Sequence, residues 1–323
     1  MALLSPLAVA PMIDWTNTYF RILMRILAPS ALLYTEMQTA GAIAHNPARN
    51  LHFNAIENPL ALQLGGSDPH PLLQAAQQAQ ELGYDEINLN IGCPSDRVQS
   101  GRFGACLMAE PDLVARIIRI FKQSIQLPIT VKTRIGIDHQ DEYAFFAHFV
   151  ERVVDAGCDK LIVHARKAWL KGLSPKQNRT IPPVNYDYVY RIKQAYPSLP
   201  VVINGNITDL DSVIRHLSLV DGVMLGRLAC NNPYAIAEIH HALYPDSVLL
   251  TRQTVVDNYR NYLQSLARSN VPLSIVLKPL FGLAHGLPNA RSWKHHLMTI
   301  RTLEQLDSHV FTDANVDSSA FVD

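Results

Sequence analysis

The sequence predicts a (β/α)8 barrel followed by a small all-helical domain. Eight short apolar runs recur along residues 7–227, with helix-like segments between them. Near-continuous apolar strands that alternate with amphipathic helices are typical of a parallel sheet. Polar and charged residues follow these runs repeatedly, and barrels build their sites at the carboxyl ends of the strands. This second observation favours a closed barrel over the alternative, an open doubly wound sheet.

The eight runs are, in order, LAVAPM (7–12), ALLYTE (31–36), LALQLGG (60–66), INLNIGCP (87–94), ITVKTRIG (129–136), LIVHAR (161–166), VVINGNI (201–207) and GVMLGR (222–227). Helices are predicted between them. In segment 67–83, Asp68 can cap the helix, Pro69 fits its first turn and Gly83 fits its end. Segments 110–124 and 141–157 are predicted to be helices as well.

The strand pattern stops after residue 245, where segments 251–269 and 289–305 indicate helices only. We therefore expect a barrel domain over residues 1–242 and a helical domain over 243–305. Residues 306–323 are expected to be a disordered acidic tail.

Composition excludes several classes of protein. No apolar stretch is long enough to cross a membrane, and the first residues lack the basic region of a secretory signal, so we expect a cytoplasmic protein. The 4 cysteines are too few for a disulfide framework and form no CxxC pair, so no metal site is expected. The sequence shows no exposed heptad pattern, and we expect a monomer.

Charge is balanced overall, with 28 basic and 28 acidic residues, but it is segregated along the chain. Segment 160–179 carries Lys and Arg without any acid, and residues 241–302 are also predominantly basic. Two basic regions of this kind can face one polyanion.

Cationic side chains follow the fifth and sixth runs. Lys132 and Arg134 occupy alternate positions and so share one face of their strand, as do His164 and Arg166. These strands supply no nearby acid, so anion binding or catalysis is favoured over a buried ion pair. For His164, a hydrogen-bonded structural role is the alternative.

Glycine-containing turns follow the last two runs, INGNI and MLGRLA. Barrels commonly bind phosphate after these two strands, because glycine allows backbone N–H groups to approach the ligand. The predicted phosphate site comprises Asn204, Gly205, Asn206, Gly226 and Arg227. Glycine that merely ends a strand is the alternative.

Cys93 lies between Gly92 and Pro94, directly after the fourth run. Two turn-forming neighbours hold the thiol in a defined place over the barrel mouth. A thiol of ordinary pKa, about 8.5, is mostly protonated at neutral pH and can donate a proton. A nucleophile would suit the same geometry. The other cysteines fit the role of small buried hydrophobes.

Seven motifs together resemble a known family. In order and spacing, APMIDWTN, ALQLGG, INLNIGCPS, VKTRIG, HAR, INGNI and GR resemble the flavin-dependent tRNA-dihydrouridine synthases, from Val9 to about Met298. Segment 164–183, HARKAWLKGLSPKQNRTIPP, resembles the A subgroup, which is associated with uridines 20 and 20a of the tRNA D-loop. One departure is visible: the family motif NGG is NGN here, and asparagine tolerates the positive φ that glycine adopts.

The resemblance implies FMN in the barrel mouth and NADPH as its reductant. Hydride would pass from N5 of FMN to C6 of the uracil, and Cys93 would protonate C5. The implied cofactor-binding residues are Pro11, Met12, Gln63, Lys132, His164, Asn204, Gly205, Asn206, Gly226 and Arg227.

A tRNA substrate implies that the target base leaves its stack to reach the flavin. Asn90 is expected to contact the uracil, and basic residues are expected to contact the RNA. The expected RNA contacts are Arg134, Arg166, Lys167, Lys171, Lys176, Gln177, Arg179, Arg291 and Lys294.

Three other functions stay open at this point. An FMN barrel that reduces a free pyrimidine or another small molecule gives no role to the basic loop and helical domain. A non-catalytic RNA-binding barrel is the second, because fold alone does not fix function. A Schiff-base aldolase that uses Lys132 gives no role to Cys93.

Overall fold

The computed structural model describes residues 5–265 and 271–311 of the 323-residue chain. The chain divides into two compact units. The first comprises the described residues up to Thr18 together with Ser30–Gly226, and the second comprises Tyr19–Pro29 together with the described residues from Arg227 onward. This division differs from the expected boundary after residue 242, because α10 (Arg227–Asn231) and α11 (Pro233–Leu243) pack against the η5 turn (Lys278–Gly282).

All eight predicted runs form strands of one parallel sheet, in the order β1-β9-β8-β7-β6-β5-β4-β2. β1 and β2 complete the circle, because the N–H of Leu32 donates to the Leu7 carbonyl and the N–H of Val9 donates to the Leu32 carbonyl, both at 3.0 Å. The predicted barrel is confirmed. Its strands are β1 (Leu7–Val9), β2 (Leu33–Tyr34), β4 (Leu60–Gly65), β5 (Glu86–Ile91), β6 (Ile129–Arg134), β7 (Lys160–His164), β8 (Val201–Asn204) and β9 (Gly222–Leu225).

A further short strand, β3 (Gln38–Thr39), pairs with the end of β4 beside Leu64 and Gly65. Its two residues are too few to show a strand period, so the sequence does not predict it.

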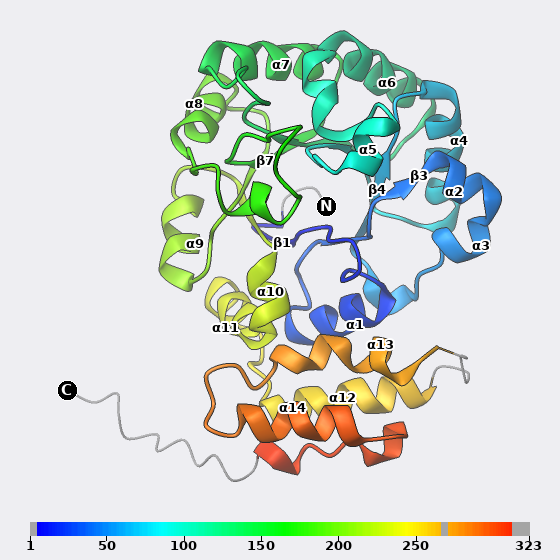
Figure 1. Cartoon of the computed structure of the whole chain (residues 1–323), viewed down its shortest axis with the longest axis vertical. Coiled ribbons are helices and arrows are strands. Elements are labelled where there is room, and N and C mark those ends of the chain that lie inside the picture. Colours follow the sequence, from blue (N-terminus) through cyan, green and yellow to red (C-terminus); the bar gives the residue numbers. More distant parts are fainter. Residues whose placement is uncertain (1–4, 266–270, 312–323) are drawn as a thin grey trace. The chain divides into compact units, whose positions relative to one another are not determined.

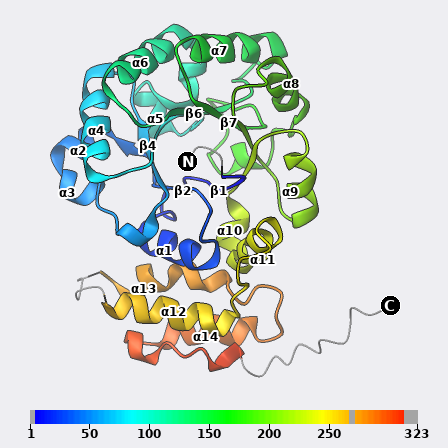
Figure 2. The same cartoon turned by 180° about the vertical axis from the view of Figure 1, so that it is seen from behind.

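Helices form a ring outside the strands (Figure 1), and the view from behind shows β4, β6 and β7 inside that ring (Figure 2). The outer helices are α4 (Pro69–Leu82), α6 (Pro111–Ser124), α7 (Tyr143–Asp155), α8 (Asp187–Ala195) and α9 (Leu210–Leu217). Shorter elements lie between them: α2 (Ala40–His45), α3 (Pro47–Asn50), η2 (Ala55–Glu57), α5 (Asp96–Ser100), η3 (Gly104–Ala109) and η4 (Gln177–Arg179).

Helix α4 begins and ends as its sequence predicts. The Asp68 side chain accepts a hydrogen bond from the N–H of His70 at 3.2 Å, Pro69 is the first helical residue, and Gly83 adopts φ 88° just after the end.

The barrel interior has an apolar half and a polar half. Small and apolar side chains on or directly beside β1, β2, β8 and β9 form one cluster with Ala61 and Ile162: Ala8, Ala10, Leu32, Tyr34, Val202 and Met224. Strands β4 to β7 instead bury polar side chains: Gln63, Glu86, Asn88, Thr130 and Lys160. Because buried polar groups need partners, the polar half must be internally hydrogen-bonded.

The second unit is helical, as predicted for the end of the chain. α12 (Arg252–Ser265), α13 (Leu273–Leu277) and α14 (Ala290–Thr299) lie side by side in both views (Figures 1 and 2). Trp293 is fully buried and its indole N–H donates to the Leu280 carbonyl at 2.8 Å. Most of α1 (Thr18–Leu27), a helix that the sequence analysis missed, also belongs to this unit.

The structured part of the second unit extends past the expected end at residue 305. Leu306 is buried, η7 (His309–Phe311) follows η6 (Leu303–Gln305), and the Phe311 ring packs on Trp293 with centroids 4.7 Å apart. The rest of the expected tail, 312–323, lies outside the described residues. In the described part of the chain, no helix is both long and apolar enough to cross a membrane.

Candidate active site at the carboxyl ends of the strands

Asn90, near the end of β5, fixes the loop that carries Cys93. Its Oδ1 accepts hydrogen bonds from the N–H groups of Gly92 at 3.1 Å and Cys93 at 3.0 Å. The Cys93 carbonyl in turn accepts from the N–H of Ala105 at 2.9 Å. The half-buried thiol, 3.5 Å from the Ser95 hydroxyl, is thus held by backbone bonds on both sides.

Lys132 points across the mouth from β6 to β8, where its Nζ donates to the Oδ1 of Asn204 at 3.3 Å. Burial lowers the pKa of this ammonium group to about 7; Arg134 adds to the effect and Cys93 opposes it. The thiol, the amine and the guanidinium are therefore close enough to interact electrostatically, which brings together three of the predicted residues.

Arg134 is only 4% exposed, and its guanidinium bonds backbone rather than facing the mouth. Its Nε donates to the Gly92 carbonyl at 3.0 Å, and its Nη1 donates to the carbonyls of Lys167 at 3.1 Å and Asn178 at 3.0 Å. Burial lowers the pKa of Arg134 to about 10, with smaller contributions from Arg179 and Arg166. The side chain thus ties the Cys93 loop to the loop after β7, a role different from the expected RNA contact.

Asn204 and the two residues after it line the far side of the mouth. The Nδ2 of Asn204 donates to the Met224 carbonyl at 2.7 Å, which joins β8 to β9. Gly205 has φ 123°, and a Cβ there would lie 2.8 Å from the Cδ2 of half-buried His164. Exposed Asn206 has φ 54°, so asparagine does adopt the left-handed conformation expected where the motif departs from glycine.

The predicted residues from β1 and β9 are also at strand ends. Pro11 and Met12 follow β1 and are half-buried, and Met12 packs against the apolar interior cluster. Gly226 follows β9, where an added Cβ would lie 3.7 Å from the Met12 sulfur. Arg227 is exposed and begins α10 in the second unit.

The basic loop after β7 contains both tethered and exposed side chains. Arg166 is buried and its Nη1 bonds the Pro182 carbonyl. Lys167 pairs with Asp141 at 2.6 Å and lies over the Trp169 ring, 4.4 Å from its centroid. The side chains that remain exposed are Lys171, Lys176, Gln177 and Arg179.

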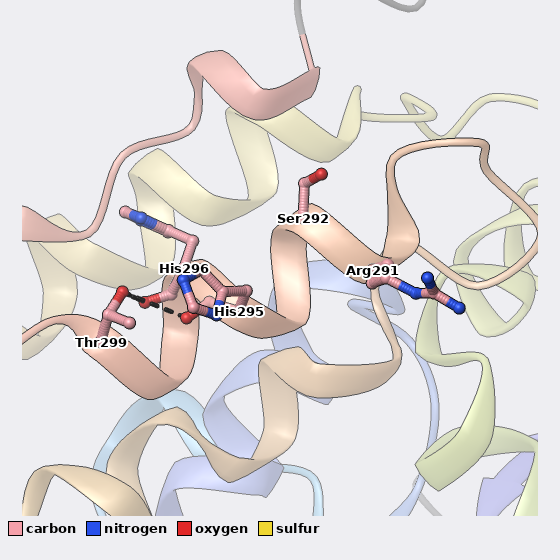
Figure 3. A pocket seen from close by; sticks show the side chains of 5 residues that line it. All are labelled: Arg291, Ser292, His295, His296 and Thr299. Atoms are coloured by element: carbon pink, nitrogen blue, oxygen red, sulfur yellow. Dashed lines mark hydrogen bonds between the residues drawn. The ribbon is translucent and has the colours of Figure 1, made fainter.

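On α14 of the second unit, Arg291 and Lys294 are exposed. Arg291 also lines a surface pocket with Ser292, His295, His296 and Thr299, and its guanidinium points away from the two histidines (Figure 3). Trp293 of the same helix is fully buried in the core of the second unit.

Other residues, which the sequence did not predict, hold the loops of the site in place through hydrogen bonds. Buried Asn178 bonds the backbone of Trp169 and Leu173, and the Nε2 of Gln99 bridges the carbonyls of Pro94 and Leu170. Glu86, Asn88 and Asn90 occupy alternate positions of β5. That period of two was a visible signal for a polar interior face.

The other cysteines lie in more apolar surroundings or away from the strand ends. Cys158 is buried, and burial raises the pKa of its thiol to about 12. Burial, with Glu110 adding, also raises the pKa of Cys106. Cys230 is buried, as predicted, and no cluster of potential metal ligands occurs in the part of the chain that the structure describes.

Comparison with known proteins decides the family. The family model described as Dihydrouridine synthase (Dus) matches residues 8–319. The chain belongs to the dihydrouridine synthase family. The resemblance found in the motifs is therefore confirmed over nearly the whole sequence.

Several proteins named tRNA-dihydrouridine(20/20a) synthase are similar to this member of the dihydrouridine synthase family. The protein of Shewanella oneidensis is 50% identical over 291 residues, which cover 90% of this chain and 87% of that protein. The protein of Xanthomonas axonopodis pv. citri is 52% identical, and the match covers 90% of this chain and 87% of that protein. The protein of Synechocystis sp. is 49% identical, and the match covers 91% of this chain and 89% of that protein.

A solved structure of 2-naphthoyl-CoA reductase in complex with 2-naphthoyl-CoA shares the fold of this family member. The TM-score is 0.58 at 8% sequence identity, and the match covers 74% of this chain and 50% of the reductase. At this identity the likeness supports the barrel fold alone.

Proposed function

We propose that this chain reduces the C5–C6 double bond of uridine 20 or 20a in the tRNA D-loop, with FMN at the barrel mouth and NADPH as reductant. The observation that carries the proposal is the tethered thiol: two backbone bonds to Asn90 hold Cys93 beside Lys132, at the mouth where barrel enzymes bind their substrates. Relatives about half identical over 90% of the chain have names that agree with this activity.

The residues at the mouth fit a flavin mononucleotide. Lys132 and His164 offer one cationic and one imidazole group, and Gly205 closes on His164 so tightly that a Cβ would collide with it. Asn206, in the left-handed conformation, and Gly226, directly after β9, are proposed to present backbone N–H groups to the phosphate. Gln63, Pro11 and Met12 are proposed to line the ring system. When bound, FMN would supply the hydride that is added to C6 of the uracil, and NADPH would reduce the flavin.

Cys93 supplies the proton that completes the reduction. Hydride at C6 leaves negative charge on C5 and the adjacent carbonyl, and the thiol proton of Cys93 passes to C5, so that the base gains two hydrogens. Asn90 keeps the loop in register. Lys132 and Arg134 on β6 both interact electrostatically with the Cys93 thiol and are proposed to stay beside it during the transfer.

The exposed basic side chains are proposed to bind tRNA phosphates: Lys171, Lys176 and Arg179 after β7, and Arg291 and Lys294 on α14. The exposed amide of Gln177 is proposed to contact the RNA beside them. Such contacts give a binding affinity that falls steeply with salt concentration. Arg166 and Lys167 stay in the proposal through the positioning of this loop, since buried Arg166 bonds a backbone carbonyl and Lys167 is paired with Asp141.

The proposal is tested by incubating the purified protein, FMN and NADPH with an unmodified tRNA transcript. The RNA is then digested, and the masses of its nucleosides are measured by mass spectrometry. We expect uridine heavier by two hydrogens at position 20 or 20a. Cys93→Ala should remove most of the product, and Cys106→Ala, at a half-buried thiol that bonds the Phe103 carbonyl, should not. Free uridine incubated in parallel tests the alternative of a small-molecule reductase.

Three outcomes would contradict the proposal. Reduction of free uridine at the same rate as tRNA would favour the small-molecule reductase. Tight tRNA binding by a colourless protein that takes up no FMN would favour the non-catalytic RNA-binding barrel. Full activity of Cys93→Ala would remove the thiol from the reaction.

A further inference from the structure

A continuous chain of side-chain hydrogen bonds runs along the polar half of the barrel, from Glu86 at the start of β5 to the Cys93 loop. The Nδ2 of Asn90 donates to the Oε1 of Gln63 at 2.8 Å, and the Nε2 of Gln63 donates to the Oδ1 of Asn88 at 2.8 Å. Asn88 then donates through Nδ2 to the Oγ1 of Thr130 at 2.8 Å, and Thr130 donates to the Oε1 of Glu86 at 2.6 Å.

Every bond of this chain points the same way, and its two ends dictate the direction. Glu86 forms an ion pair with Lys160, Nζ to Oε2 at 2.5 Å, and an ionised carboxylate accepts hydrogen bonds only. Thr130 must therefore donate to Glu86, which leaves its lone pairs for Asn88. Each amide then turns its NH2 toward Glu86 and its oxygen toward the mouth.

At the mouth this direction delivers an acceptor where one is needed. Asn90 presents Oδ1, not NH2, to the N–H groups of Gly92 and Cys93. A reversed amide would place donors against donors and release the loop. The direction set by Glu86 is thus the one that the Cys93 loop requires.

The Glu86–Lys160 pair is almost completely shielded from solvent. Both side chains are about 1% exposed, and burying two charges costs free energy that apolar residues of similar size would not. Glu86 accepts from three donors, because Tyr34 also bonds its Oε1 at 2.8 Å. A satisfied network of this kind selects one conformation of its members.

We propose that Glu86 and Thr130 are positioning residues for Cys93: the buried carboxylate orients the amides of Asn88, Gln63 and Asn90, and so holds the catalytic loop in place from the far side of the barrel. The proposal rests on the proposed function only for what Cys93 does once it is held. The hydrogen-bond chain and its effect on the loop belong to the protein without cofactor or RNA.

Amide hydrogen exchange of residues 90–95 in the flavin-free protein tests the positioning directly. Thr130→Val removes the hydroxyl while keeping the shape, and we expect exchange at Gly92 and Cys93 to quicken by about fivefold or more, as loss of an ordinary hydrogen bond would produce. Thr130→Ser keeps a hydroxyl and should restore protection. Tyr34→Phe is the matched control, since it removes another bond to the same Glu86 oxygen that is not part of the chain.

A second readout separates positioning from general loosening. In the FMN-loaded protein, Thr130→Val should lower kcat for tRNA reduction on the order of tenfold while KM changes little, since misplaced catalytic groups slow the chemical step. Thermal unfolding of Thr130→Val and Tyr34→Phe should be similar. If Thr130→Val does not fold, Asn88→Ala removes the next link and is judged by the same criteria.

Equal protection of Gly92 and Cys93 in wild type and Thr130→Val would overturn the proposal, as would equal loss of protection in Thr130→Val and Tyr34→Phe. These results are independent of the proposed reaction. Wild-type protein that makes no dihydrouridine but shows the expected exchange pattern would contradict the proposed function and leave the positioning chain standing.

Discussion

The Nζ of Lys132 on β6 bonds the Oδ1 of Asn204 on β8, 3.3 Å away, so a single side chain spans the mouth above the intervening strand β7. The amide oxygen carries no full charge, and burial accordingly lowers the pKa of Lys132 to about 7. Close to neutral pH this amine is thus present in both its charged and its neutral form.

Lys132→Met should stabilise the flavin-free protein most at low pH. The folded pKa of about 7 lies below the ordinary value of 10.5, so below pH 7 both folded and unfolded chains carry the proton and the cost of burying the charge is fully present. Between pH 7 and 10.5 the unfolded chain binds more protons, and wild-type stability rises with pH. At pH 6 the free energy of unfolding of Lys132→Met, measured with denaturant, should therefore exceed that of wild type by on the order of a few kcal/mol. This difference should shrink at pH 10.

Lys171→Met, at an exposed position of the loop after β7, controls for the loss of one positive charge. If the free energies of unfolding of Lys132→Met and wild type differed by the same amount at pH 6 and pH 10, burial would not be lowering the pKa of Lys132.

Arg134→Lys should loosen two loops at once. Lysine keeps the charge but lacks the planar fork, so it cannot reach the carbonyls of Gly92, Lys167 and Asn178 together. We expect about 2 kcal/mol of destabilisation or more, because buried carbonyls lose charged donors. Hydrogen exchange should quicken both around residue 93 and across residues 167–180.

Arg152→Lys is the matched control. Arg152 is half-buried and bonds the exposed Asp112 at the surface, so this substitution should change stability little. Faster exchange in only one of the two loops would show that Arg134 does not couple them.

Substitutions in the Glu86–Lys160 pair should affect the stability of the fold and the positioning of the Cys93 loop separately. Lys160→Met leaves a buried carboxylate without its cation, and we expect a loss of about 3–5 kcal/mol in the free energy of unfolding. Adding Glu86→Leu removes the stranded charge and should recover most of that loss. The double variant should still show faster exchange at Cys93, because Thr130 no longer has a carboxylate to donate to.

Urea unfolding of the two variants measures the first effect. If the double variant were as unstable as Lys160→Met alone, shape rather than charge would dominate at this position.

The barrel could be predicted from the sequence, but the hydrogen bonds inside it could not. Every strand run was apolar and regularly spaced, so β1 to β9 could be placed except β3, whose two residues carry no period. The helices of the second unit were expected after residue 245, yet α1 was not, because its neighbours in space come from residues far along the chain.

Residues at the mouth were predicted from their position at strand ends, and Cys93, Lys132, His164 and Asn204 do lie there. What side chains bond to was not predictable in the same way. Arg134 looked like a free cation because no acid is near it in sequence, whereas its partners are carbonyls on two loops. Hydrogen bonds to backbone leave no mark in residue types, so only coordinates reveal them.

Gly205→Ala should weaken flavin binding more than it weakens the fold. Gly205 has φ 123°, and its added Cβ would lie 2.8 Å from the Cδ2 of His164, so the imidazole must move. Gly172→Ala is the matched control, since Gly172 also has a positive φ, 83°, but no atom lies within 4 Å of the added Cβ.

Both substitutions should destabilise the fold by about 1 kcal/mol or more through backbone strain. Only Gly205→Ala should lose flavin affinity, by about tenfold or more, which corresponds to about 1.4 kcal/mol. Titration of each flavin-free variant with FMN, followed by quenching of flavin fluorescence, measures the affinity; equal affinities for the two variants would mean that His164 is not part of the flavin site.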